Sequence, residues 1–107
     1  MTACTIDKNK VNYGGAGGLQ ITGSNSTVTN TTISKNKSNI GAGGISVSSN
    51  ANAVFTRVGL LDNLSTFGGG GGAAISDEGN ATFLGCFFHQ NTGYTGGGGM
   101  WVVNGEA

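Results

Sequence analysis

Acidic side chains are the first candidates for chemistry in this chain. Paired carboxylates act as general acid and base, and clustered carboxylates bind metal ions. Asp7 and Asp62 stand far apart in the sequence, and Asp77 and Glu78 form an isolated pair. None of these four acids has a second acid at the matching position of the repeat described below. We therefore expect no catalytic residue and no metal site in this chain.

The single histidine and the two cysteines add little to this chemistry. His89 is expected to face outward, with no histidine, cysteine or acid converging on it. Cys4 and Cys86 occupy the same inward position of the repeat, three units apart. At about 4.8 Å per stacked unit, three units span roughly 14 Å. This exceeds the ~7 Å limit for a disulfide, so we expect two buried thiols.

A run of glycines offers a possible phosphate loop. Residues 68–72 are all glycine and precede Ala73, which allows an alignment with the pattern G-x-G-x-x-A. Such a loop needs the N-terminus of a following helix. No window of the chain has the apolar spacing of a helix, and every repeat carries its own glycine loop. We interpret the glycines as structural and expect no cofactor.

The elements that position these residues follow a repeat of about 27 residues, a period typical of solenoids. Four asparagines mark it at successive spacings of 27, 27 and 28: Asn9, Asn36, Asn63 and Asn91. An apolar residue stands three positions before each asparagine: Ile6, Ile33, Leu60 and Phe88. A loop after each asparagine ends in a Gly-Gly pair, which is followed by alternating apolar residues.

This pattern predicts an all-β fold. Alternation with period 2 is typical of strands with one buried face. One unit cannot bury its apolar face alone, so equivalent strands of successive units must stack. We predict a right-handed parallel β-helix, a solenoid of just under four coils of about 27 residues with three short strands per coil. We expect the four asparagines to form an inward ladder, and the glycines to supply positive φ and close approach at the bends.

Residues 1–107 are predicted to form a single β-helix segment that starts and ends in mid-coil. Solenoids need polar caps to cover their edges, and neither end of the chain has one. We therefore expect a fragment of a longer protein, with adjoining β-helix coils as its partners. The five basic and five acidic residues balance, so nucleic acid is not an expected partner. No apolar run approaches the roughly 20 residues that span a bilayer, so we expect no membrane insertion by this segment.

Two motifs resemble those of a known family. Phe88-x-x-Asn91 and Gly71-Gly72-Ala73 are similar to the repeats of polymorphic outer-membrane proteins, which are autotransporter passengers with a pectin-lyase-like right-handed β-helix. The other units have Ile or Leu in place of the Phe, and three units lack the Ala. The resemblance implies an extracellular or cell-surface location and an adhesin-like role. It transfers no catalytic residue.

Aromatic residues of the last unit are the candidate contacts for a ligand or partner. Phe87 and Trp101 are expected to face outward, and Tyr94 lies in the loop between them. Packing against a further coil or a flanking domain is the structural alternative for these side chains. Our leading hypothesis is a non-catalytic structural and binding segment of a surface-exposed or secreted adhesin-like protein, with carbohydrate or a host or cell-surface protein as candidate partner. The alternative is a fragment of a carbohydrate-active β-helix enzyme, a polysaccharide lyase or glycoside hydrolase, whose catalytic coils lie elsewhere.

Overall fold

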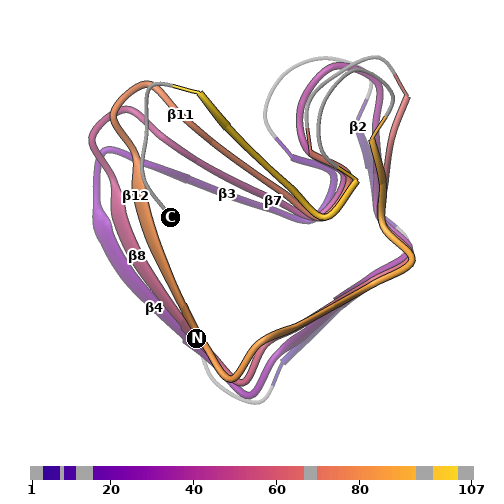
Figure 1. Ribbon diagram of the computed structural model, residues 1–107, viewed down its shortest axis with the longest axis horizontal. Helices are drawn as coiled ribbons and strands as arrows, with labels where there is room; N and C mark the ends of the chain where they lie inside the picture. The colour runs from indigo at the N-terminus through magenta and orange to yellow at the C-terminus, as the bar shows by residue number, and fades with distance from the viewer. Residues whose placement is uncertain (1–3, 8, 12–15, 67–69, 94–97, 104–107) are drawn as a thin grey trace.

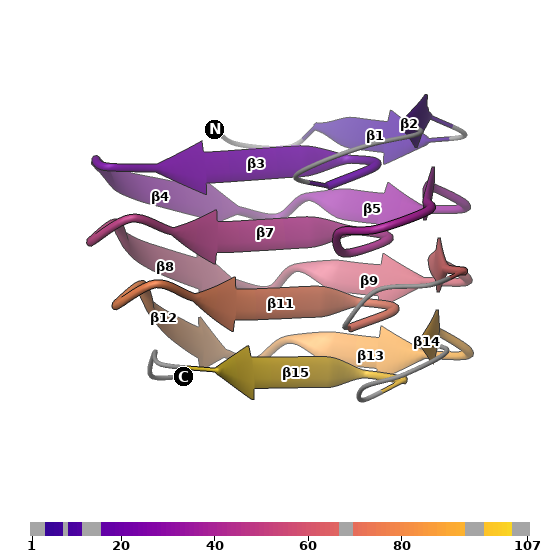
Figure 2. The ribbon, with the colours of Figure 1, turned by 90° about the horizontal axis from the view of Figure 1, so that it is seen from above.

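The computed structural model describes residues 4–7, 9–11, 16–66, 70–93 and 98–103, with the side chains of residues 11, 101 and 103 outside this description. This part of the chain holds fifteen short strands and no helix. The chain winds into coils that superimpose when viewed along their stacking direction (Figure 1). Turned by 90°, they appear as four stacked layers (Figure 2). The predicted parallel β-helix is confirmed.

Equivalent strands of successive coils pair in parallel and form four sheets. Each sheet is named here after its first strand. The β1 sheet consists of β1 (Thr5–Asp7), β5 (Thr32–Ser34), β9 (Gly59–Leu61) and β13 (Phe87–His89). The β2 sheet consists of β2 (Lys10–Val11), β6 (Lys37–Ser38), β10 (Leu64–Ser65) and β14 (Thr92–Gly93). The β3 sheet consists of β3 (Leu19–Thr22), β7 (Ile45–Ser48), β11 (Ala73–Ser76) and β15 (Met100–Val103). The β4 sheet consists of β4 (Asn25–Thr29), β8 (Asn52–Thr56) and β12 (Asn80–Leu84).

The prediction of three strands per coil was wrong, because the strands of the β2 sheet were not foreseen. Each of them has only two residues. An alternation of period 2 cannot be recognised in so short a segment. These strands follow the ladder asparagines directly, and β6 leads into the loop of residues 39–44, which protrudes from one corner of the coil (Figure 1).

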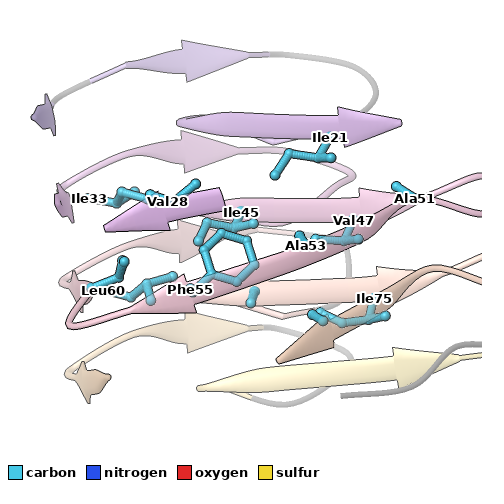
Figure 3. Close-up of a cluster of buried hydrophobic side chains, with 13 residues drawn as sticks. Ile21, Val28, Ile33, Ile45, Val47, Ala51, Ala53, Phe55, Leu60 and Ile75 are labelled. Carbon is cyan, nitrogen blue, oxygen red and sulfur yellow. The ribbon is translucent and has the colours of Figure 1, made fainter. Parts of the chain in front are cut away.

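The strand register confirms the repeat. Ile33 pairs with Ile6 on one side and with Leu60 on the other, and Leu60 pairs with Phe88. Within the coils, Ile33 and Leu60 are completely buried. They belong to one apolar cluster that runs along the solenoid axis and includes Phe55 (Figure 3). The ring of Phe55 stacks on that of Phe83 one coil further on, with centroids 4.9 Å apart.

Glycine plays a narrower part in the bends than predicted. Within the described residues, positive φ occurs at Gly23 and Gly85, and more often at residues other than glycine: Asn30, Lys35, Ser49, Asn50, Arg57, Asp62, Asp77, Glu78 and Gln90. Asn and Asp tolerate the left-handed conformation because their short polar side chains bond to nearby backbone. The expectation that glycine would supply positive φ at the bends was therefore wrong for most of them.

The Gly-Gly pairs instead permit close approach between coils. A Cβ on Gly43 would lie 2.5 Å from the backbone nitrogen of Leu64 in the next coil, and one on Gly44 would lie 2.5 Å from the carbonyl oxygen of Gly72. A Cβ on Gly44 would also lie 3.1 Å from Nδ2 of Asn63. The returning end of each loop therefore lies directly on the departing strand and the asparagine of the next coil, where only glycine fits.

The prediction of two buried, unbridged thiols is confirmed only in part. Neither Cys4 nor Cys86 is in a disulfide. Cys86 is half-buried, and its Sγ donates to the carbonyl oxygen of Phe55. Cys4 is exposed, so the prediction of a buried thiol was wrong there. The reason is its place in the outermost coil, where no described strand stacks on its outer side.

Candidate functional site

The four predicted ladder asparagines come together as a structural element. Asn36 donates through Nδ2 to Oδ1 of Asn63 at 3.1 Å, and Asn63 donates in the same way to Asn91 at 3.0 Å. Asn9 donates to Asn36 at 3.1 Å. The backbone N–H groups of Asn9, Asn36 and Asn63 each bond to the same oxygen as their own side-chain amide. These bonds all run in one direction, from each coil toward the next.

The ladder also fixes the preceding strands. Nδ2 of Asn36, Asn63 and Asn91 donates to the carbonyl oxygens of Ile6, Ile33 and Leu60, respectively. Asn36 and Asn63 are 1% exposed. Because these amides are buried and engaged on both sides, they serve the fold and are not available to a ligand.

A second asparagine ladder escaped the sequence analysis. Asn80 donates through Nδ2 to Oδ1 of Asn52 at 2.9 Å, and Asn52 donates to Asn25 at 3.2 Å. These three residues are exposed at the start of the β4-sheet strands. The signal was present in the sequence as asparagines that recur once per coil, each three positions before a large apolar residue: Val28, Phe55 and Phe83.

Phe87 is the predicted contact residue that the structure describes. It lies on the outer face of β13 and is 59% exposed, as the alternation of the strand predicted. Its ring stacks on that of His89, with centroids 5.6 Å apart and an interplanar angle of 12°. His89 is also exposed, which confirms its predicted outward orientation. The stacked pair was missed, because it depends on side-chain rotamers that residue spacing does not reveal.

The neighbouring coil leaves room beside this pair. Phe87 pairs in register with Gly59, and His89 pairs with Leu61. A Cβ placed on Gly59 would meet only the Cγ of Leu61, at 4.0 Å. The outer face of the β1 sheet therefore combines two nearly parallel rings, an apolar side chain and an open backbone position, an arrangement that suits contact with a ring or a small apolar group.

The other two predicted contacts remain predictions. Tyr94 lies outside the described residues. Trp101 belongs to β15, but its side chain is outside the described part of the structure.

The acids occupy separate places. Asp7 lies in β1 and accepts a hydrogen bond from Oγ of Ser34 at 2.8 Å. Asp62 follows β9, and Asp77 and Glu78 form an exposed bend after β11. Within the described residues, no three His, Cys, Asp or Glu side chains gather in a way that could hold a metal ion. Nor does that part of the chain contain a helix able to span a membrane.

Comparison with known proteins identifies the architecture. The family model described as right handed beta helix region matches residues 2–107. No curated protein and no solved structure matches the chain.

Proposed function

Because the chain belongs to the right-handed β-helix family, we propose that it is a non-catalytic structural and binding segment of a surface-exposed or secreted, adhesin-like protein. Its stacked coils form a rigid support, and adjoining coils of a longer parent chain would stack on its two ends. Phe87 and His89 form the contact point for a carbohydrate or a cell-surface protein.

One observation carries this proposal. Phe87 keeps 59% of its surface exposed on the outer face of a sheet whose inner face already contributes Phe88 to the core. An exposed phenylalanine adds nothing to that core, whereas a ring stacked on a neighbouring imidazole presents a flat apolar surface to a partner. The separation of Asp7 and Asp62 supports the non-catalytic part of the proposal, since acid–base catalysis needs the two groups on one substrate.

The test is a binding screen of the full chain against immobilised glycans and cell-surface proteins. Any ligand found is then tested with Phe87→Ala and with Ile40→Ala as the matched control, since Ile40 is a large apolar residue exposed to 51% in a loop. We expect Phe87→Ala to weaken binding at least about tenfold, the loss typical of a central aromatic contact. Equal binding by the two variants would remove Phe87 from the site.

A further inference from the structure

Triplets of the form Asn-x-Ser/Thr, the acceptor sequence for N-linked glycans, occur five times in the chain. Their asparagines are Asn25, Asn30, Asn36, Asn63 and Asn80. The chain contains no proline, so no middle residue blocks modification. In a chain so rich in asparagine and threonine, the triplet alone does not identify a modified residue. The structure divides the five triplets into two groups.

The two triplets that end in serine are buried within the coil. Asn36 and Asn63, the central members of the inward ladder, are 1% exposed. Ser38 and Ser65, which carry the hydroxyl groups of these triplets, are completely buried. A transferase therefore reaches neither the asparagine nor the serine of these two triplets in the folded chain.

The buried amides also have no hydrogen and no space to give up. Nδ2 of Asn63 donates to Oδ1 of Asn91 and to the carbonyl oxygen of Ile33, so both of its hydrogens are engaged. A Cβ on Gly44 would already lie 3.1 Å from this nitrogen. Asn36 is held in the same way. A sugar on either nitrogen would break the ladder and displace the neighbouring chain.

The three triplets that end in threonine lie on the surface. Their asparagines are all exposed: Asn25, Asn30 and Asn80. Of the threonines, Thr27 and Thr82 are exposed and Thr32 is half-buried. Both the acceptor amide and the hydroxyl group of these triplets are therefore accessible.

This exposure does not come from the two ends of the described coils. Asn52 lies between Asn25 and Asn80 in one column, with a coil stacked on each side, and it is exposed all the same. Arg57 is exposed in the bend equivalent to that of Asn30. The strands β4, β8 and β12 form one side of the solenoid (Figure 1). A further coil at either end would therefore leave these columns open to solvent.

The exposed amides can accept a sugar without losing a bond. Oδ1 of Asn30 accepts from Nε of Arg57 at 2.6 Å, and Oδ1 of Asn25 accepts from Nδ2 of Asn52 at 3.2 Å. Within the described part of the chain, Nδ2 of Asn25 and of Asn30 has no hydrogen-bond partner. Nδ2 of Asn80 donates one hydrogen to Asn52 and keeps the other. Each of the three nitrogens thus has one hydrogen that a bond to carbon can replace.

From this division by burial and amide bonding, we propose that Asn25, Asn30 and Asn80 are attachment sites for N-linked glycans, and that Asn36 and Asn63 are not. A glycosyltransferase of the export route supplies a sugar that carries a diphosphate at its anomeric carbon. Nδ2 forms a bond to that carbon, the bond from carbon to the diphosphate oxygen breaks with its electron pair, and Nδ2 releases one proton. No group is oxidised or reduced. The proposal rests on the secreted or surface location proposed above, and not on the stacked ring pair.

Glycans at these sites would cover one side of the solenoid. Asn25 and Asn80 stand at the start of β-strands of the β4 sheet, and Asn30 follows the end of one. Between them the outer face of this sheet exposes Val54 to 37% and Leu84 to 52%. Because N-linked glycans are bulky and solubilising, they would shield these apolar side chains from other proteins.

The first experiment produces the full chain behind a secretory leader in a eukaryotic cell line, so that modification is measured independently of the natural export route. Peptide mass spectrometry of the secreted, folded chain is carried out before and after peptide-N-glycosidase, which converts a glycosylated asparagine into aspartate. We expect glycans at Asn25, Asn30 and Asn80, and none at Asn36 and Asn63. Occupancy that is no higher at the three exposed asparagines than at the two buried ones would overturn the proposal.

A matched pair of substitutions tests the triplet of Asn30. Thr32→Val removes the hydroxyl group and retains the shape of the side chain, whereas Thr32→Ser retains the hydroxyl. We expect the glycan at Asn30 to be lost in Thr32→Val and kept in Thr32→Ser, with the other sites unchanged in both. A glycan that persists at Asn30 in Thr32→Val would contradict attachment through this triplet.

The exposed column also allows a site to be gained. Asn52 is exposed but belongs to no triplet, because Val54 stands where the hydroxyl is needed. Val54→Thr completes the triplet, and Asn25→Gln with Asn80→Gln in the same chain prevents crowding by neighbouring glycans. We expect a new glycan at Asn52, and an unmodified Asn52 in the secreted chain would refute the role of exposure. Phe87 and His89 are unchanged in all these variants, so the binding screen above shows separately whether the proposed function fails.

Discussion

Replacing Asn63 by alanine tests whether the buried ladder stabilises the coils. The Asn63 side chain accepts from the backbone N–H of Asn36 at 3.0 Å and from its Nδ2 at 3.1 Å. Both donors are buried, since Asn36 is 1% exposed. Each buried donor left unpaired costs about 1–3 kcal/mol. The two donors together predict a loss of about 2–6 kcal/mol in the free energy of unfolding, a large part of the ~5–15 kcal/mol of a typical domain.

Asn52→Ala provides a matched control. Asn52 is also the central member of an asparagine ladder, with one amide bond to Asn25 and one from Asn80. It is exposed, so water replaces the lost partners, and the expected loss is below about 1 kcal/mol.

Urea denaturation followed by far-ultraviolet circular dichroism gives both values. The midpoint should fall much further for Asn63→Ala than for Asn52→Ala, with similar slopes for the folded variants. Equal losses for the two variants would refute the reasoning, because burial would then have no influence on the ladder energy. If Asn63→Ala does not fold, its loss exceeds the stability of the chain, and the ranking against Asn52→Ala still holds.

Two further pairs of substitutions test close approach and core packing. A Cβ on Gly44 would lie 2.5 Å from the carbonyl oxygen of Gly72. Gly44→Ala should therefore lower the free energy of unfolding by about 1–3 kcal/mol, the usual cost of overpacking. The position of a Cβ on Gly59 is open. Gly59→Ala should therefore stay within about 0.5 kcal/mol of the unchanged chain in the same urea assay. Phe55 is completely buried, and Phe55→Ala should cost about 3–5 kcal/mol in thermal or urea unfolding. Phe87→Ala should cost less than about 1 kcal/mol, and a larger loss would assign Phe87 a structural role.

The sequence was sufficient to predict the coil because identical positions touch identical positions. Asn36 and Asn63 show this most directly, since their spacing of one repeat alone predicted that their amides would bond. The apolar position three residues earlier was equally readable, since Ile33 and Leu60 pair in register. In a stacked repeat, residues that lie one repeat apart in the sequence are in contact, so the period of the sequence predicts which residues touch.

The features that were missed do not follow from the repeat of residue types along the chain. The two-residue strand at Lys37–Ser38 is too short for any alternation. Positive φ at Lys35 reflects the path of the backbone and not the preference of lysine. At the candidate site, the exposure of Phe87 followed from alternation, whereas its stacking on His89 depends on rotamers that the sequence does not specify.

The uniform spacing of the pairings also bears on how the chain folds. The described strand partners lie one coil apart in the sequence, as with Thr5 and Thr32 or Leu64 and Thr92. This separation is about a quarter of the chain length, so these pairings are non-local, as in slowly folding β-proteins. Each coil must therefore close a long loop before its pairing contributes free energy. Once two coils have formed, however, every further coil adds to an existing edge, so folding should start slowly at any adjacent pair and then spread in both directions.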